Sequence, residues 1–156
     1  MPGNVRAGQV ISLVEVTGGL GAKVDAQKLA DELDVNIDGL FSILNAAEIL
    51  GLVKSEKGVV SLTELGLKFQ KTSTDKVRML KDRLAMIEPF RTALELSSKG
   101  KSVTAGQVAD SLLEIGIKWH YQPDINESLI KALLVHWTIY GGLMKYDGKS
   151  GKFQKA

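Results

Sequence analysis

The chain reads Gly51-Leu52-Val53-Lys54 before a turn at Lys57-Gly58, and the same pattern returns as Gly142-Leu143-Met144-Lys145 before Asp147-Gly148. In each copy the glycine follows a long helical pattern with an apolar stripe, where a helix needs a left-handed terminating residue. The two turn pairs are typical of the tip of a β-hairpin. We therefore expect one unit, made of helices and a hairpin, to occur twice.

The first half of the chain has the pattern of a helix-turn-helix. Apolar positions in residues 9–16 suit a short buried helix, and Gly18-Gly19 is expected to break it. Asp25 can cap a second helix by accepting hydrogen bonds from the amides of its first turn, and Asn36 can cap a third. The third helix carries one apolar stripe, made of Ile37, Leu40, Phe41, Leu44 and Ala47.

A hairpin and a short closing helix follow this helix-turn-helix. Residues 52–54 and 59–62 are predicted strands on either side of Lys57-Gly58, and Thr63 can cap a helix that runs to Phe69. A helix-turn-helix with such a hairpin wing is a winged helix. The polar run at residues 71–74 marks a boundary, so we predict one domain over residues 1–72 and a second over residues 73–156.

The second half repeats this plan after a longer helical segment. Residues 75–98 predict one long helix with a kink at Pro89, because proline lacks the amide hydrogen. Thr104 and Gln107 form a capping-box pattern, and the last long helix leads to predicted strands at residues 143–146 and 150–154. We predict a mainly α fold of the α+β kind with tandem winged-helix domains, the second braced by the long helix.

The composition is that of a protein with its own core and no membrane span. Of the 156 residues, 44% are apolar, which is enough to bury a core. The charge-free stretch at residues 132–144 is shorter than the roughly 20 residues of a membrane helix, and residues 1–9 lack an apolar signal core. The absence of cysteine excludes disulfides, thiolate zinc sites and cysteine nucleophiles. We expect a cytoplasmic protein without membrane insertion.

Several stretches of the chain resemble the AAA-associated C-terminal domain, which is usually fused behind the ATPase of nitrate, sulfonate and taurine type ABC transporters. The matching stretches cover residues 8–16, 46–52, 61–66 and 137–147. The resemblance extends over nearly the whole chain and implies a regulatory or docking role beside a transporter ATPase, with no catalytic residues to carry over. The sequence contains no ATPase, so we expect this domain to be freestanding.

The sequence offers no set of reacting groups. Gly148-Lys149-Ser150 has the end of a phosphate loop, but the required first glycine falls on Leu143. His120 and His136 lack a nearby cluster of acidic ligands, and metal sites need three or four converging ligands. No Ser-His-Asp series is suggested by the spacing. We expect no enzyme, no cofactor and no metal site.

Charge is unevenly distributed over a net +2. Residues 1–72 carry seven Lys/Arg against nine Asp/Glu, a net charge of −2, whereas residues 73–156 carry thirteen against nine, a net charge of +4. The third helix has no Lys or Arg between Asn36 and Leu50, which disfavours DNA reading, and Asn45 alone is a plausible base reader. The loop at residues 119–121 can either dock a partner or fold its aromatic rings onto the core.

Two functions fit these observations. The resemblance and the acidic third helix favour a docking or regulatory module that binds an ABC ATPase or self-associates, and a homodimer is compatible with either function. The alternative is a DNA-binding transcriptional regulator that uses the basic second half. Basic side chains that converge on one face would favour duplex DNA. The candidate partner or DNA contacts are Asn45, Lys76, Arg78, Lys81, Arg83, Trp119, Tyr121, Lys131, Lys145, Lys149 and Lys152.

Overall fold

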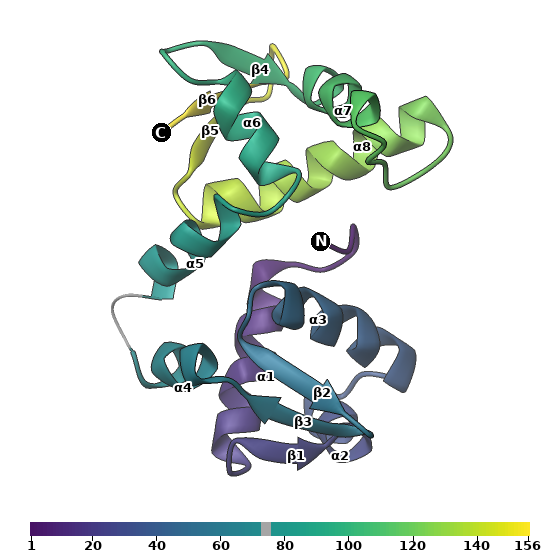
Figure 1. The fold of residues 1–156 in the computed structure, drawn as a ribbon, viewed down its shortest axis with the longest axis vertical. Coiled ribbons are helices and arrows are strands. Elements are labelled where there is room, and N and C mark those ends of the chain that lie inside the picture. The colour runs from purple at the N-terminus through teal and green to yellow at the C-terminus, as the bar shows by residue number, and fades with distance from the viewer. Residues whose placement is uncertain (73–75) are drawn as a thin grey trace. The chain divides into compact units, whose positions relative to one another are not determined.

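The computed structural model describes residues 1–72 and 76–156. The chain forms two compact units, Met1–Met79 and Leu80–Ala156. The fold is α+β, because most of the described residues are helical and each unit adds one small antiparallel sheet of three strands (Figure 1). The predicted domain junction and the predicted start of the long helix involve residues 73–75, which lie outside the described residues.

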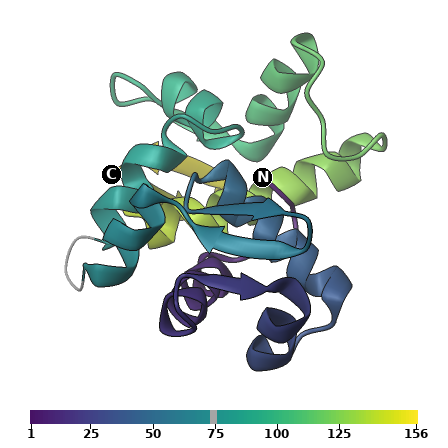
Figure 2. The same cartoon turned by 60° about the horizontal axis from the view of Figure 1, so that its bottom comes forward.

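In the first unit, three helices and an edge strand precede the hairpin. The order is α1 (Ala7–Gly19), β1 (Lys23–Asp25), α2 (Ala26–Leu33), α3 (Ile37–Ile49), β2 (Val53–Glu56), β3 (Val59–Leu62) and α4 (Glu64–Lys71), and then α5 (Lys76–Leu84) crosses the border between the units. The sheet has the order β1-β3-β2, and its three strands lie side by side in both ribbon views (Figures 1 and 2).

The predicted caps of the first unit are confirmed. The Asp25 carboxylate accepts from the Gln27 and Lys28 amides at the start of α2, and the Asn36 side chain accepts from Gly39 in α3. Lys57 and Gly58 have φ angles of 50° and 78° and form the hairpin tip. The helix α1 includes Gly18 and ends at Gly19, so it stops within the glycine-rich segment that was predicted to break it. The strand β1 was not predicted.

One turn joins helix to strand in both units. Gly51 has a φ of 79°, and the next amide, that of Leu52, donates back to the Ala47 carbonyl at 2.9 Å. Gly142 has a φ of 68°, and the Leu143 amide likewise donates to Thr138 at 2.8 Å. Both leucines are buried. Each glycine therefore ends its helix in a left-handed conformation and directs the chain into the hairpin.

The carbonyl of Leu52 is the point where α4 packs on the hairpin. It accepts from the Thr63 amide at 3.1 Å, while the Thr63 hydroxyl donates to the Gly51 carbonyl at 2.6 Å and accepts from Gly66 at 3.0 Å. A Cβ added to Gly66 would lie 2.0 Å from the Leu52 oxygen. Only glycine allows this approach, so the Leu-Thr-Glu-Leu-Gly stretch is a packing motif as well as a helix start.

We predict that Gly66→Ala lowers the free energy of unfolding by about 3 kcal/mol, because the new methyl group overlaps a backbone oxygen that cannot move without breaking the turn. Gly8→Ala is the matched control, since no atom lies within 4 Å of its added Cβ in α1, and its effect should lie between no change and a gain of about 1 kcal/mol. Urea unfolding measures both. Equal stability of the two variants would contradict this account.

The second unit repeats the order of the first. It contains α6 (Phe90–Leu96), β4 (Ser102–Thr104), α7 (Ala105–Glu114), α8 (Pro123–Leu133) with a π-helical turn η1 (Leu134–Thr138), β5 (Met144–Asp147) and β6 (Lys152–Lys155). The sheet order β4-β6-β5 matches β1-β3-β2 position by position. The predicted repeat of helices and a hairpin is therefore confirmed, and the capping box of Thr104 and Gln107 opens α7 as predicted.

The long bracing helix predicted over residues 75–98 is wrong, because α5 ends at Leu84 and α6 begins at Phe90. Pro89 stands at the N-cap position of α6. Proline supplies no amide hydrogen and its ring crowds the preceding turn, so it separates two helices here instead of kinking one. The predicted turn at Asp147-Gly148 also differs, because the loop between β5 and β6 spans residues 148–151.

The cores of the two units consist of large apolar side chains. In the first unit, Leu13, Leu40 and Phe69 are fully buried between the helices and the sheet. In the second, Trp137 and Phe90 are fully buried, with ring centroids 6.4 Å apart. Each such side chain contributes about 1.5–3 kcal/mol through the apolar area it removes from water. Within the described residues, no helix combines the length and apolarity that a membrane crossing requires.

Candidate partner-binding surfaces

The sheet of the second unit has one apolar and one polar face. Val103, Tyr146 and Phe153 form one row of paired residues, and Phe153 is completely buried on the helix side. The rows on either side of it point to the other face, because side chains alternate along a strand. These rows consist of Ser102, Gln154 and Lys145, and of Thr104, Lys152 and Asp147.

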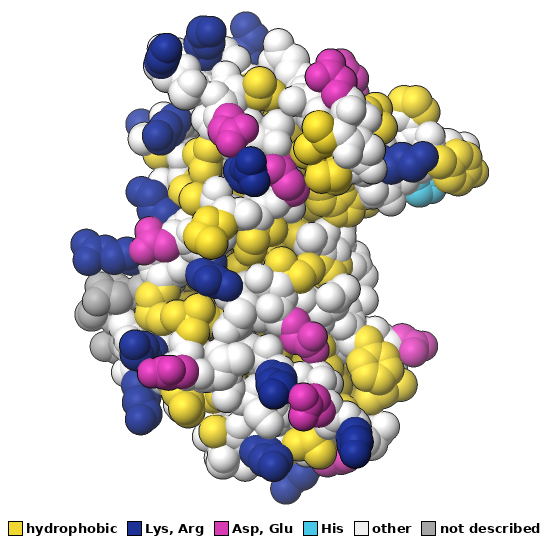
Figure 3. All heavy atoms as spheres, in the orientation of Figure 1, with side chains coloured by type: hydrophobic (Ala, Val, Ile, Leu, Met, Phe, Trp, Pro, Cys, Tyr) yellow, Lys and Arg dark blue, Asp and Glu magenta, His cyan; other side chains and the backbone are white. Residues whose placement is uncertain are grey.

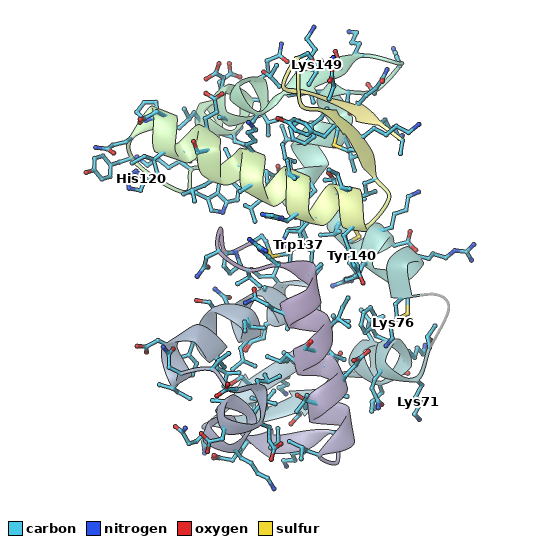
Figure 4. All side chains as sticks on the ribbon, turned by 180° about the vertical axis from the view of Figure 1, so that it is seen from behind. Lys71, Lys76, His120, Trp137, Tyr140 and Lys149 are labelled. Atoms are coloured by element: carbon cyan, nitrogen blue, oxygen red, sulfur yellow. The ribbon has the colours of Figure 1, made fainter. Side chains whose placement is uncertain are left out.

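The polar face of this sheet is basic. Lys145 and Lys152 line a shallow hollow of about 320 Å³ on it, and Lys149 is exposed in the adjoining loop. Among the residues that the structure describes, no carboxylate lies within 4.0 Å of these three ammonium groups. Lys and Arg side chains gather at this end of the unit (Figure 3), where Figure 4 labels Lys149.

Lys131 lies on the opposite side of the sheet from Lys145 and Lys152. Its ammonium nitrogen is 5.8 Å from the centre of the Tyr146 ring, which packs on Phe153 with centroids 4.6 Å apart. The charge of Lys131 therefore lies over the Tyr146 ring on the helix side. The structure does not bring this lysine together with those of the polar face.

The candidate residues of α3 and α5 lie apart from that surface in sequence and differ in their surroundings. Lys76 pairs with Glu15 at 2.6 Å and lies 5.6 Å from the Phe69 ring centre, so its charge is used within the first unit. Arg78 and Lys81 are exposed on α5, whereas Arg83 is half-buried. Asn45 is exposed on α3 beside Phe41, which is also exposed.

The helices that precede the two hairpins present carboxylates at their first turns. Asp38 is exposed in the first turn of α3, and Asp124 is exposed in the first turn of α8, with Glu127 one turn further on. Acidic side chains stabilise a helix N-terminus through its dipole. The same carboxylates would repel the phosphates of DNA, which a recognition helix approaches with its N-terminal residues.

The loop between α7 and α8 is held by one buried side chain. Asn126 is 1% exposed, and its Oδ1 accepts from the backbone amides of Trp119 at 2.7 Å and His120 at 3.2 Å. The Gln122 amide donates to His120 Nδ1 at 3.0 Å. Trp119 is half-buried, but Tyr121 is 75% exposed and stacks on the His120 ring, with centroids 4.7 Å apart. The loop thus presents Tyr121 to solvent.

Asn126 was not among the residues predicted to matter. The one signal available was a polar residue at a position where α8 needs a buried one, next to Ile130 in the following turn. Its Oδ1 atom accepts two backbone amides, whereas its buried Nδ2 atom has no hydrogen-bond partner among the described residues. Because both acceptor bonds fix the loop, Asn126 determines where Tyr121 stands.

We predict that Asn126→Ala lowers the free energy of unfolding by about 1–3 kcal/mol, because two backbone amides lose their acceptor. Hydrogen exchange at the Trp119 and His120 amides should become faster in the variant. Asn45→Ala, at an exposed position, should stay within about 0.5 kcal/mol of the parent. Unchanged exchange at both loop amides would show that Asn126 does not hold the loop.

The loop of the second hairpin is closed by Asp147. Its carboxylate accepts from the Ser150 hydroxyl at 2.8 Å and from the Lys149 amide at 3.1 Å. These bonds, first that of the Ser150 side chain, lower the pKa of Asp147 from its ordinary value of 3.8. Gly148, Lys149 and Ser150, which resemble the end of a phosphate loop, therefore form a turn around a carboxylate.

We predict that Asp147 titrates below 3.8 and that Ser150→Ala raises its pKa toward that value. Because the folded-state pKa is lowered, the carboxylate's contribution to stability is complete above the unfolded pKa and is lost as pH falls through the folded pKa. NMR titration of the Asp147 side-chain carbon measures this. A titration midpoint that is the same in parent and variant would refute the role of Ser150.

The described residues contain no group of three or more His, Cys, Asp or Glu side chains that could hold a metal ion. His120 Nδ1 is engaged as an acceptor within its loop. What the structure offers is a set of surfaces: a basic sheet face, two helix starts with carboxylates, and a loop that exposes an aromatic ring. These surfaces fit recognition of a macromolecule.

The chain belongs to a family of accessory domains, that of the C-terminal AAA-associated domain, whose sequence model matches residues 27–147. The match includes elements of both units, from α2 to β5. The family association with ATPases indicates a protein partner. Neither the curated proteins nor the solved structures contain a match to this chain.

Proposed function

We propose that this chain is a non-catalytic docking or regulatory module of an ABC transporter ATPase, built from tandem winged-helix domains. The observation that carries the proposal is the family match, which extends over residues 27–147 and so includes the larger part of each unit. A module bound to such an ATPase would act on the cytoplasmic side of the membrane. Self-association into a homodimer is compatible with this role.

The repeated order of elements supports the winged-helix part of the proposal. Each unit places a helix, an edge strand, two helices and a hairpin in the same sequence, and in each the last strand lies in the middle of the sheet. In a winged helix the third helix and the hairpin are the usual recognition elements. We place the junction of the two domains between residues 72 and 73, in the connection between α4 and α5.

The charges on the recognition elements support protein docking over DNA reading. Asp38 and Asp124 occupy the first turns of α3 and α8, and Lys131 is directed to Tyr146 on the helix side of the sheet. Neither helix thus presents a basic N-terminal turn to phosphates. Protein surfaces tolerate such carboxylates, since they can pair with Lys or Arg of the partner.

Affinity capture tests the proposal. We expect the tagged chain to retain an ABC ATPase from lysate of its source cells, to the same extent with and without nuclease, because protein contacts do not depend on nucleic acid. The isolated chain should hydrolyse no ATP. Recovery of DNA that disappears on nuclease treatment, without an ATPase, would overturn the docking proposal.

Duplex DNA is the second candidate, and the observation that favours it is the basic sheet face of the second unit. Lys145, Lys149 and Lys152 are exposed there without a carboxylate within ion-pair distance in the described chain. Three lysines can supply non-specific, salt-sensitive attraction to phosphates. They carry no sequence information by themselves.

Charge reversal distinguishes this second candidate. In fluorescence anisotropy we expect no saturable binding of a labelled duplex by the parent chain. The anisotropy curve of the triple variant Lys145→Glu, Lys149→Glu, Lys152→Glu should therefore be the same as that of the parent. Lys54→Glu is the control at the position of the first unit that corresponds to Lys145. If the chain bound DNA, its affinity for the duplex would instead fall as the salt concentration rises. The slope of log affinity against log salt concentration would then be smaller by about 3 in the triple variant and unchanged in Lys54→Glu.

A further inference from the structure

The end of the second unit away from its basic sheet is an apolar corner, formed where α7 turns into α8. Four large apolar side chains are exposed within this short stretch: Leu113 (44%), Ile115 (66%), Tyr121 (75%) and Ile125 (37%). Apolar side chains gather at this end in the space-filling view, beside a histidine (Figure 3). Figure 4 labels His120 there and Lys149 at the sheet end of the same unit.

The corner is built rigidly. Gly116, with a φ of 79°, ends α7: its amide donates to Leu113 at 3.0 Å, and the next amide, that of Ile117, donates to Leu112 at 2.9 Å. Asn126 holds the following backbone, and the Gln122 amide bonds to His120. Hydrogen bonds therefore hold the backbone on either side of Tyr121, and an ordered backbone lowers the entropy cost of binding.

An exposed aromatic ring on an ordered loop has few structural uses. The Tyr121 ring contacts His120 but is mostly in water, so its contribution to the stability of the unit is small. Buried aromatic anchors, tyrosine among them, carry much of the binding energy of protein interfaces. The other exposed apolar side chains of this stretch would add apolar area to such an interface.

The charges around the corner define the partner's chemistry. Residues 113–127 contain three carboxylates, Glu114, Asp124 and Glu127, against the single cation Lys118, a net charge of −2 with His120 neutral. None of the four has an ion-pair partner within 4.0 Å in the described parts of the chain. A complementary surface carries Lys or Arg, and an Arg can also stack on the tyrosine ring.

A two-fold symmetric dimer in which the corners of two copies face each other is disfavoured. An isologous interface would place the same carboxylates opposite one another, and like charges disfavour such a contact. The basic sheet face of a second copy has the right charge, but the rows that form it contain no large apolar side chain. The corner thus fits a partner whose surface combines apolar and cationic side chains.

We propose that this α7–α8 corner is the docking surface of the chain, and that it binds a protein segment in which apolar side chains are flanked by Lys or Arg. The proposal deepens the proposed function, on which it rests, by naming the surface that meets the ATPase. Tyr121 is the anchor, Asn126 positions it, and the surrounding carboxylates select a cationic partner.

Photo-cross-linking tests the proposal in the full chain within its source cells. p-Benzoylphenylalanine replaces Tyr121 in one variant and Lys149, at the other end of the same unit, in a control. We expect a cross-link from position 121 to an ABC ATPase, at a peptide with apolar residues next to Lys or Arg, and none from position 149. In affinity measurements with that ATPase, Tyr121→Ala should lower affinity by about tenfold or more, and Tyr140→Ala, at another exposed tyrosine, by less than about twofold.

The outcomes separate this proposal from the proposed function. A cross-link from position 121 to such a peptide in a protein other than an ATPase would support the corner and overturn the ATPase assignment. If the chain captures an ATPase but cross-links from position 149 or not at all, or if position 121 cross-links to a second copy, the corner proposal is overturned. Full binding by Tyr121→Ala with an unchanged melting temperature would also overturn it.

Discussion

The glycine turn between helix and hairpin is the constraint on which both units depend. At Gly51 and Gly142 the chain takes a left-handed conformation, and the following leucine amide bonds back to the helix. That leucine then enters the core, so the strand after it starts in a fixed direction and register. The Gly-Leu-apolar-Lys pattern therefore occurs twice because both units need a left-handed glycine followed by a buried leucine. The lysine that ends the pattern is exposed in both sheets.

This register divides each sheet into a buried and an exposed face, and the second unit uses the division to separate its charges. Two lysines and Asp147 occupy the exposed rows of its sheet, whereas residues 113–127, which contain the apolar corner, carry three carboxylates and one lysine. A small domain with such an arrangement has surfaces suited to recognition and, in the described residues, no cluster of titratable groups suited to metal chemistry. Membership of the C-terminal AAA-associated family agrees with an accessory role.

Local chemistry was readable at four helix caps and one hairpin tip, where a residue acts on its immediate neighbours, but not at α8, whose N-cap is Gln122 and not Asp124. Asp25, Asn36, Thr63 and Thr104 cap helices in the structure as their spacing predicted, and Lys57-Gly58 forms the tip of its hairpin. The strands β1 and β4 could not be predicted, because each has three residues and exists only by pairing with a strand far along the chain. Pro89 was recognised as a disturbance, but the local pattern did not reveal that it stands at the N-cap of α6 and separates two helices.

Most caps, the glycine turns, the two hairpins and the family could be read from the residues alone. The folded structure was needed to show which face of the second sheet carries Lys145 and Lys152, that Lys131 lies on the other face, and that Tyr121 is exposed while Asn126 is buried. The physical reason is the separation along the chain between the groups that interact. Caps and turns involve amides within a few residues, whereas exposure and charge grouping depend on contacts between segments that the chain brings together only on folding.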